Sequence, residues 1–380
     1  MQPSSAGQQT TERFLELDSL RGLAAMMILV HHLVQLWIER GNCEPVRFPA
    51  ILMPIYLGGD GAVVLFFVLS GFVLSLPAIS GRPQSYFTFV TRRIFRIYVP
   101  YLAAVAISVC GAYWLHGAVI GCGLFHHCWS DPVSWALVGR HLLFLGSFNT
   151  QQFDPPVWSL VYEMRVSLFF PLLCAIALRL NKQWNAIFMV MLCSIAMAIG
   201  SYQNAEFSKS MIDTMYYAGF FAFGILLARE QASCTAWYCS LDKTAKAMFA
   251  LLCIVVYLVV GPLSLGWHLL GSPRLTVTVS QWLKALSAGG FIVLALNSPA
   301  SKRMLRWAPV HWVGKRSYSL YLTHYIVMLY CVHLLYGRVH LLAILGLVFV
   351  LSLAVAGFSY RFVELPSMNL GRRLGNLFSR

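Results

Sequence analysis

Ten long stretches of the chain consist mainly of apolar residues, and short polar segments separate them. A helix that crosses a membrane needs about 20 such residues to span roughly 30 Å of hydrocarbon. Each stretch approaches this length, so the pattern predicts ten transmembrane helices. They are residues 20–38, 57–78, 97–116, 157–178, 184–200, 211–228, 247–265, 281–297, 316–336 and 341–361.

An eleventh apolar stretch, residues 133–149, is shorter and contains Arg140 and His141. If it crossed the membrane, the basic loop near residue 180 would lie outside, against the positive-inside rule. We therefore expect a re-entrant or interfacial helix here. The predicted fold is an all-α polytopic membrane protein with about ten transmembrane helices and this one short helix.

Composition supports a membrane protein, because 58% of the residues are hydrophobic and only 11% are charged, with a mean hydropathy of +0.68. Soluble domains have about 25% charged residues. The formal net charge is +14, but most of the 28 Lys and Arg residues fall on one side of the predicted topology. The positive-inside rule then predicts that both termini are cytoplasmic. The charge orients the protein among membrane lipids and does not indicate nucleic-acid binding.

Apolar stretches follow one another without a long interruption, which predicts a single membrane domain over residues 17–366. Residues 1–16 are expected to form a disordered cytoplasmic tail, and residues 367–380 a basic cytoplasmic tail.

The first predicted span carries Arg21 at one end and the pair His31–His32 within it. Eleven residues separate Arg21 from His32, about 20° more than three full helical turns, so both project from one face roughly 16 Å apart. His31 points about a quarter-turn away. In a purely structural interpretation, a neighbouring helix hydrogen-bonds the histidine, and the arginine side chain extends to the lipid headgroups. The functional interpretation is a site on this face.

Other ionisable residues also lie at membrane depth, where they are costly and often functional. Asp60 and Glu163 lie at about the predicted depth of His32, and His324 lies near mid-membrane. Glu163 needs a partner, for which His32, Arg165 and Lys284 are the candidates.

A basic cluster follows the second span: Arg92, Arg93 and Arg96. It is compatible with a positive-inside anchor or with a phosphate clamp, because guanidinium groups bind phosphate with paired hydrogen bonds. Pro100 is expected to mark the start of the next span.

The sequence "CGLFHHC" at residues 122–128 allows three interpretations. Cys122 and Cys128 can form a disulfide in an oxidising exterior, they can remain thiols, or they can bind a metal together with His126 and His127. We expect neither a bound metal nor a permanently bound cofactor.

These residues together suggest acyl transfer. A histidine can act as a general base and a carboxylate can orient its ring, while arginines at a cytoplasmic mouth suit a phosphorylated donor such as coenzyme A. No G-x-S-x-G or H-E-x-x-H motif is present, which argues against a serine hydrolase or a zincin.

Six segments in order resemble the acyltransferase-3 family of membrane proteins, over residues 17–366. They are "LDSLRGLAAMMILVHH", "GGDGAVVLFFVLSGFVLS", "TRRIFRIYVPY", "PPVWSLVYEMRVSLFFP", "SYSLYLTH" and "FVELP".

The resemblance implies transfer of an acyl group, usually acetyl from acetyl-CoA, to a hydroxyl of a glycan, a lipid-linked sugar or another acceptor. It implies His32 as catalytic base with Arg21 as its same-face partner, and Arg92, Arg93 and Arg96 on the donor side. Glu163 falls in the family's W-S-L-x-x-E motif and His324 in its S-Y-x-x-Y-x-x-H motif; Asp60 is our further candidate. Many members have a second acidic residue after that glutamate, where this chain has Met164. We expect a multi-pass protein of a bacterial inner (plasma) membrane.

Two other classes of function remain open at this point. A polytopic transporter would also bury histidine and aspartate, although the chain lacks two similar halves. A non-catalytic membrane scaffold would tolerate the loss of Arg21 and His32. The sequence leaves the acceptor undetermined, and His32 is compatible with either direct base catalysis or transient acylation.

Overall fold

The computed structural model describes residues 14–39, 56, 58–117, 119–120, 123–144, 148–200, 206–266 and 273–378. These residues form helices and connecting turns, and no β-strand occurs among them. Nine segments of the described chain are long and apolar enough to cross a membrane. The prediction of an all-α polytopic membrane protein is therefore confirmed.

The long helices correspond one by one to the predicted spans. In chain order they are α1 (Leu15–Glu39), α3 (Gly59–Ile79), α4 (Tyr86–Leu115), α7 (Trp158–Arg179), α8 (Lys182–Gly200), α9 (Glu206–Arg229), α11 (Lys243–Gly266), α12 (Pro273–Asn297), α15 (Ser317–Leu335) and α16 (Leu341–Ser359). The stretch 184–200 lies in α8, and each of the other nine stretches overlaps one of the nine segments that are long and apolar enough to cross a membrane.

Shorter helices connect the long ones: α5 (Gly123–His126), α6 (Trp135–Leu143), the 3₁₀ turn η2 (Pro155–Val157), α10 (Gln231–Ser240), α13 (Pro299–Leu305) and α14 (Ala308–Lys315). Helix α6 has 9 residues, which at 1.5 Å per residue extend only about 14 Å. It cannot cross a bilayer, as the sequence predicted for residues 133–149.

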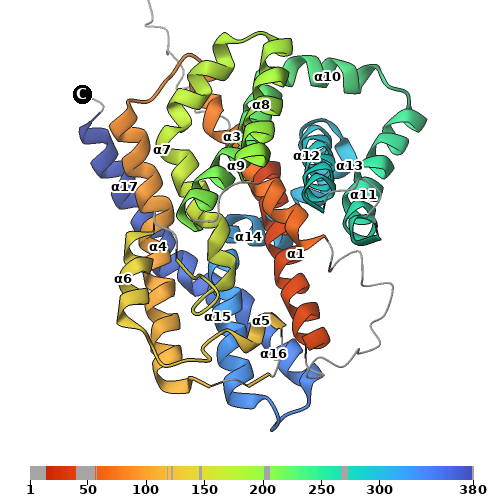
Figure 1. Cartoon of the computed structure of the whole chain (residues 1–380). Coiled ribbons are helices and arrows are strands. Elements are labelled where there is room, and N and C mark those ends of the chain that lie inside the picture. The colour runs from red at the N-terminus through yellow and green to blue at the C-terminus, as the bar shows by residue number, and fades with distance from the viewer. Residues whose placement is uncertain are drawn as a thin grey trace, which may run out of the picture.

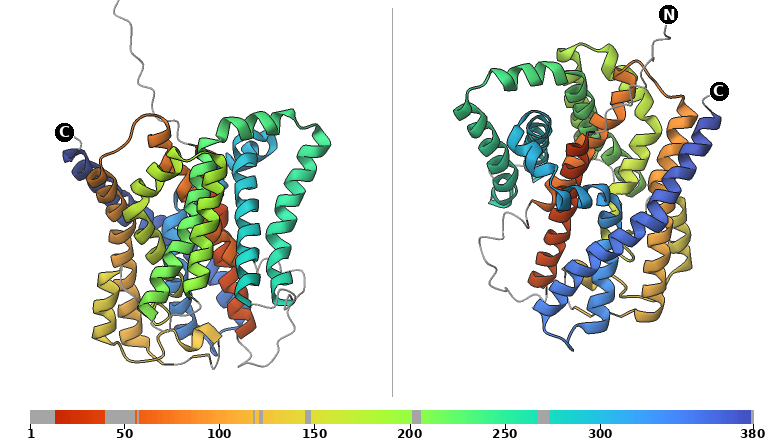
Figure 2. Two further views of the ribbon diagram at one scale, coloured as in Figure 1. Left: turned by 45° about the horizontal axis from the view of Figure 1, so that its top comes forward. Right: turned by 180° about the vertical axis from the view of Figure 1, so that it is seen from behind.

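Helix α1 runs through the middle of the molecule (Figure 1) and packs against α3, α12, α14 and α15. Helices α11 and α12 lie on one side of it, and α4, α6 and α17 (Leu365–Leu377) lie on the other, as the two further views in Figure 2 also show. This central position surrounds the polar face of α1 with other helices.

Two glycines allow α3 and α9 to pack backbone against backbone. A Cβ added at Gly71 would lie 2.1 Å from the carbonyl oxygen of Phe221, and one added at Gly224 would lie 2.1 Å from that of Val68. Small residues permit this close approach between helices in membranes. The crossing places Ser70 of α3 close to α7.

The C-terminal residues, which include most of the predicted basic tail, are helical up to Leu377. A π-helical segment, Tyr360–Glu364, follows α16 directly, and α17 continues from it to Leu377. Helix α17 packs along α4, where Gly371 lies against Phe95 and the Thr88 hydroxyl donates to the Gly375 carbonyl at 2.9 Å. Contacts with α4 therefore hold α17 in place. The basic composition of these residues does not by itself predict such packing.

Helix α4 differs from expectation, since it runs unbroken for 30 residues with Pro100 inside it. The Tyr318 hydroxyl donates to the carbonyl of Ile97 at 2.7 Å, beside the point where proline lacks an N–H. Prolines within membrane helices are tolerated when neighbouring groups satisfy the freed backbone. The arginines before Pro100 therefore lie on the same helix as the span.

We expect Gly71→Ala to destabilise the protein, because the added methyl group meets backbone atoms that cannot move alone. Overpacking typically costs about 1–3 kcal/mol, which thermal unfolding of the detergent-solubilised protein measures as a lower melting temperature. Gly346→Ala is the matched control, because no atom lies within 4 Å of its added Cβ. Equal melting temperatures for the two variants would contradict the close α3–α9 contact.

Candidate active site

The position of Arg21 is fixed by the close packing of α1 on α14. A Cβ added at Gly22 would lie 2.6 Å from the backbone nitrogen of Gly314, and one added at Gly314 would lie 2.7 Å from the carbonyl oxygen of Asp18. Only glycine fits on either side of this contact. The neighbouring Arg21 side chain projects from α1 into a pocket between α3, α4, α7 and α15.

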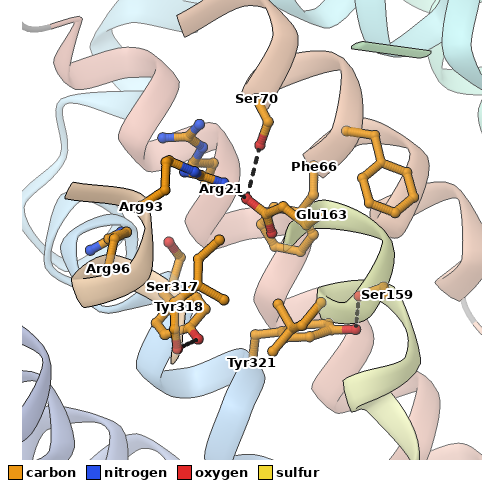
Figure 3. Close-up of a pocket in the computed structure, with 13 residues that line it drawn as sticks. Arg21, Phe66, Ser70, Arg93, Arg96, Ser159, Glu163, Ser317, Tyr318 and Tyr321 are labelled. Atoms are coloured by element: carbon orange, nitrogen blue, oxygen red, sulfur yellow. Dashed lines mark hydrogen bonds and ion pairs between the residues drawn. The ribbon is translucent and has the colours of Figure 1, made fainter. Parts of the chain in front are cut away.

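The pocket has a volume of about 70 Å³ and a mainly charged and hydroxylated lining, a little more than the space of two waters at ~30 Å³ each. It therefore admits the end of a ligand and not a whole coenzyme. Figure 3 shows the arginines on one side and Glu163 facing Arg21. The polar lining residues are Arg21, Ser70, Arg93, Arg96, Ser159, Glu163, Ser317, Tyr318 and Tyr321.

Glu163 is paired with Arg93. The Arg93 Nη2 lies 2.7 Å from Glu163 Oε1, and Arg93 Nε donates to Ser167 Oγ at 3.0 Å. The Ser70 hydroxyl makes a longer contact of 3.4 Å with the same carboxylate oxygen.

The expected partners of Glu163 were therefore wrong. Arg165 instead donates to Ser210 Oγ at 2.8 Å, and the Lys284 ammonium lies 2.6 Å from Asp60 Oδ1. Asp60 thus belongs to a separate ion pair between α3 and α12. Similar depth in the membrane did not bring either carboxylate to the histidine, because each is drawn to the cation that its own neighbouring helix supplies.

Arg96 is paired with Glu364, whose side chain is fully buried. The Ser319 hydroxyl donates to the other carboxylate oxygen at 2.5 Å, and the guanidinium lies 5.4 Å from the centre of the Tyr318 ring. The π-helical segment after α16 thus supplies the counter-ion of a pocket arginine.

The remaining arginines have contrasting surroundings. The Arg21 guanidinium makes neither a hydrogen bond nor an ion pair within the described part of the chain. Arg92 donates to Gln84 Oε1 at 3.0 Å and to Asn376 Oδ1 at 2.8 Å, and it does not line the pocket. The structure thus separates the expected basic cluster, with two of its members in the pocket and Arg92 bound to α17.

His32 lies three helical turns along α1 from Arg21, among aromatic rings. Its ring stacks on that of His324, with centroids 5.3 Å apart, and meets the Tyr325 ring edge-on at 4.9 Å. Its Nδ1 lies 3.0 Å from Gln35 Oε1.

His324 is fully buried, and its Nδ1 lies 3.0 Å from the Leu320 carbonyl. Its Nε2 has no hydrogen-bond partner among the described residues, which is unusual for a buried polar atom.

His31 has different surroundings from its neighbour. Its Nδ1 contacts the carbonyl oxygen of Tyr56, its ring stacks on the Tyr56 ring at 4.9 Å, and a Cβ at Gly59 would lie 2.5 Å from it. It packs the segment that leads into α3. The two adjacent histidines therefore face different helices, as their angular separation predicted.

Cys128 is buried beside the Tyr325 hydroxyl, 3.7 Å from its oxygen. Burial raises the pKa of this thiol to about 12, so it does not supply a thiolate nucleophile at neutral pH. Cys122 lies outside the described residues, and the disulfide and metal interpretations of residues 122–128 stay predictions. No group of three potential metal ligands occurs where side chains are described.

Comparison with known proteins assigns the chain to a family. A family model described as an acyltransferase domain matches residues 14–361, which include every helix of the pocket. The chain belongs to the acyltransferase-3 family. A protein of Komagataeibacter xylinus named a membrane-bound transacylase, BcsY, is 25% identical over 381 residues, which covers 94% of this chain and 84% of that protein. No solved structure matches the chain.

The family assignment makes the protein a membrane-embedded, acyl-transferring enzyme. The sequence alone did not indicate a functional role for Glu364, although this residue lies in the segment "FVELP", or for Gln35 and Glu39, which follow His32 on α1. An acidic residue in an apolar stretch is the signal that could have drawn attention to Glu364. Its contact with Arg96 spans 268 residues and could not be inferred from position along the chain.

We expect Arg93→Ala to destabilise the protein, because it leaves the Glu163 carboxylate unpaired. Breaking a fully buried pair costs roughly 3–5 kcal/mol; these side chains are 12% and 17% exposed, so about 2–4 kcal/mol is expected. Thermal unfolding in detergent measures it. The double variant Arg93→Met/Glu163→Met should recover most of the loss, since paired removal leaves no lone charge.

Lys182→Ala is the control for this experiment. Lys182 pairs with Glu230 at 2.6 Å, but its side chain is 65% exposed, and such pairs contribute about 0–1 kcal/mol. If Arg93→Ala and Lys182→Ala lowered the melting temperature equally, the Arg93–Glu163 pair would not have the structural role assigned to it.

Proposed function

We propose that this enzyme transfers an acyl group, most simply acetyl, from acyl-CoA to a hydroxyl group of a carbohydrate. The observation that carries the proposal is the Arg21 guanidinium, which lines a pocket on the same face of α1 as His32 and makes no ion pair with the residues that the structure describes. A cation at membrane depth without a counter-ion is costly, and an anionic substrate would supply one. An acyl-CoA combines phosphates with an acyl thioester at the end of a long flexible arm.

The two other pocket arginines differ from Arg21 in their proposed role. Arg93 and Arg96 are already neutralised by Glu163 and Glu364, so they hold the pocket together, and Arg21 is left for the donor. The distance from Arg21 to His32, about 16 Å along the helix, suits a donor whose charged and reactive parts are far apart.

In the proposed reaction, His32 takes the proton of the acceptor hydroxyl while that oxygen attacks the thioester carbonyl carbon. The carbon–sulfur bond then breaks, and the coenzyme A thiolate takes the proton from His32. Neighbouring His324 faces the Leu320 carbonyl with Nδ1, which therefore carries the ring proton. Its Nε2, which has no protein partner among the described residues, is available to accept a hydrogen bond from a hydroxyl group of the acceptor. A positioned acid–base group contributes on the order of 10²–10⁴-fold to such a reaction.

The acceptor is proposed to be a glycan or lipid-linked sugar that reaches the end of α1 nearer His32, and the donor to enter from the cytoplasm at the Arg21 end. A bacterial inner membrane offers both. Mass spectrometry of surface glycans from a deletion strain tests this, with loss of an acetyl modification as the expected result. An unchanged glycan profile would argue against a surface-glycan acceptor.

His32→Ala should abolish transfer, whereas His31→Ala should retain it. The assay follows radiolabel from acetyl-CoA into the glycan and lipid fractions of membrane vesicles that contain the enzyme. Both variants must first be shown to fold, by their melting temperature. Activity in His32→Ala vesicles together with inactive His31→Ala vesicles would overturn the proposed role of His32.

Arg21→Gln should raise the KM for acetyl-CoA on the order of 10- to 100-fold, because hydrogen bonds to charged groups contribute about 1.5–3 kcal/mol. Arg92→Gln is the control, since Arg92 binds Gln84 and Asn376 outside the pocket. If Arg92→Gln raised the KM for acetyl-CoA as much as Arg21→Gln, Arg21 would have no special role in donor binding.

Incubation with donor alone distinguishes direct transfer from a relay. Direct attack predicts that coenzyme A release depends strictly on the acceptor. A stoichiometric burst of coenzyme A and a labelled histidine in the denatured protein would instead establish a transient acyl-histidine at His32.

A further inference from the structure

A chain of three side chains runs along one face of α1 towards its C-terminal end. His32 Nδ1 lies 3.0 Å from Gln35 Oε1, and Gln35 Nε2 donates to Glu39 Oε1 at 2.8 Å. The residues are three and four positions apart, which is the spacing at which helical side chains meet. None of the three is engaged with the arginine pocket.

The chemistry of these groups fixes the direction of both hydrogen bonds. An ionised carboxylate only accepts, so the Gln35 amide must turn its NH₂ group towards Glu39 and its oxygen towards His32. An amide oxygen also only accepts, so His32 must carry its proton on Nδ1. The neutral imidazole then has its lone pair on Nε2, the nitrogen that acts as a base.

Glu39 is itself held in place by a second segment of the chain. The backbone N–H of Phe125 donates to Glu39 Oε2 at 3.1 Å. Gly123 has a φ of +75°, and a Cβ there would lie 2.2 Å from the Glu39 carboxyl carbon, so glycine is required for conformation and for space. Phe125 in turn stacks on Tyr325, which contacts the His32 ring.

We propose that Gln35 and Glu39 are positioning residues that hold His32 in the tautomer with a basic Nε2, with Glu39 acting through the Gln35 amide. This inference rests on the proposed role of His32 as the base. When His32 accepts a proton at Nε2, the imidazolium keeps its Nδ1–H bond to Gln35, and the Glu39 carboxylate offsets part of its charge through the polarised amide.

The test measures acetyl transfer in membrane vesicles for Gln35→Ala, Glu39→Gln and the double variant Gln35→Glu/Glu39→Gln. Each single variant should lower the rate at saturating acetyl-CoA by on the order of 10- to 100-fold, less than the loss of a whole acid–base group at roughly 10²–10⁴-fold. Gln35→Ala removes the acceptor that holds the Nδ1 proton of His32. Glu39→Gln removes the charge that fixes the orientation of the Gln35 amide and offsets the imidazolium. The KM for acetyl-CoA should stay unchanged, since neither residue lines the arginine pocket.

The double variant should recover most of the lost rate. It exchanges the carboxylate and the amide, so the group next to His32 still accepts from Nδ1–H and the outer amide still donates to a carboxylate. A merely structural role predicts no such recovery. Glu230→Gln, which alters a half-buried carboxylate that pairs with Lys182 and not with α1, is the control, and melting temperatures confirm that each variant folds.

Full rates in both single variants would overturn the inference, as would a double variant no more active than the single ones. Failure of the proposed function is distinguishable, because it would appear as undiminished transfer in His32→Ala vesicles. A large increase in KM with an unchanged maximal rate would assign Gln35 and Glu39 to donor binding and also contradict the proposal.

Discussion

Pairing of charges at membrane depth is the constraint on which the rest of this structure depends. A charged side chain in hydrocarbon costs at least about 2.5–3.5 kcal/mol, and partners on other helices remove most of that cost. Three of the ion pairs among the described residues join separate segments of the bundle: α4 to α7, α4 to the π-helical segment, and α3 to α12. These pairs are Arg93–Glu163, Arg96–Glu364 and Lys284–Asp60. Arg21 lies beside two of them and has no ion-pair partner in the described part of the chain, which is why we regard it as the group that meets the substrate.

The arginine pocket and the proposed base lie on one face of α1, separated by buried apolar residues that include Ala25, Ile28 and Leu29. This face runs from Arg21 to His32 and on to Glu39, and α15 faces it with Tyr321 and His324. The glycine contact between α1 and α14 fixes the arginine end, while the segment with Phe125 fixes the other end. The site is therefore preorganised by rigid helices at both ends, which is what positioning of reactive groups requires.

Sequence patterning predicted the helices well and the contacts poorly, for a physical reason. The bilayer imposes length and apolarity on every span, so α1, α9 and α15 could be found from local composition. Helical geometry also predicted that His31 and His32, as consecutive residues, point in different directions. Which carboxylate meets which cation depends on how helices are arranged, and depth alone could not decide that Glu163 pairs with Arg93. Helix α17 was missed because its order comes from packing on α4.

The most direct test of the account is the position of a non-hydrolysable acetyl-CoA analogue in a cryo-EM map of the full chain. We predict a phosphate oxygen within hydrogen-bonding distance of the Arg21 guanidinium, and the analogue's acetyl carbonyl carbon near His32. Between His32 Nε2 and that carbon there should be space for one acceptor hydroxyl, whose oxygen would lie about 3–3.5 Å from each of them. An analogue bound elsewhere, or one whose acetyl group points away from His32, would contradict the central claim that this face of α1 carries the reaction.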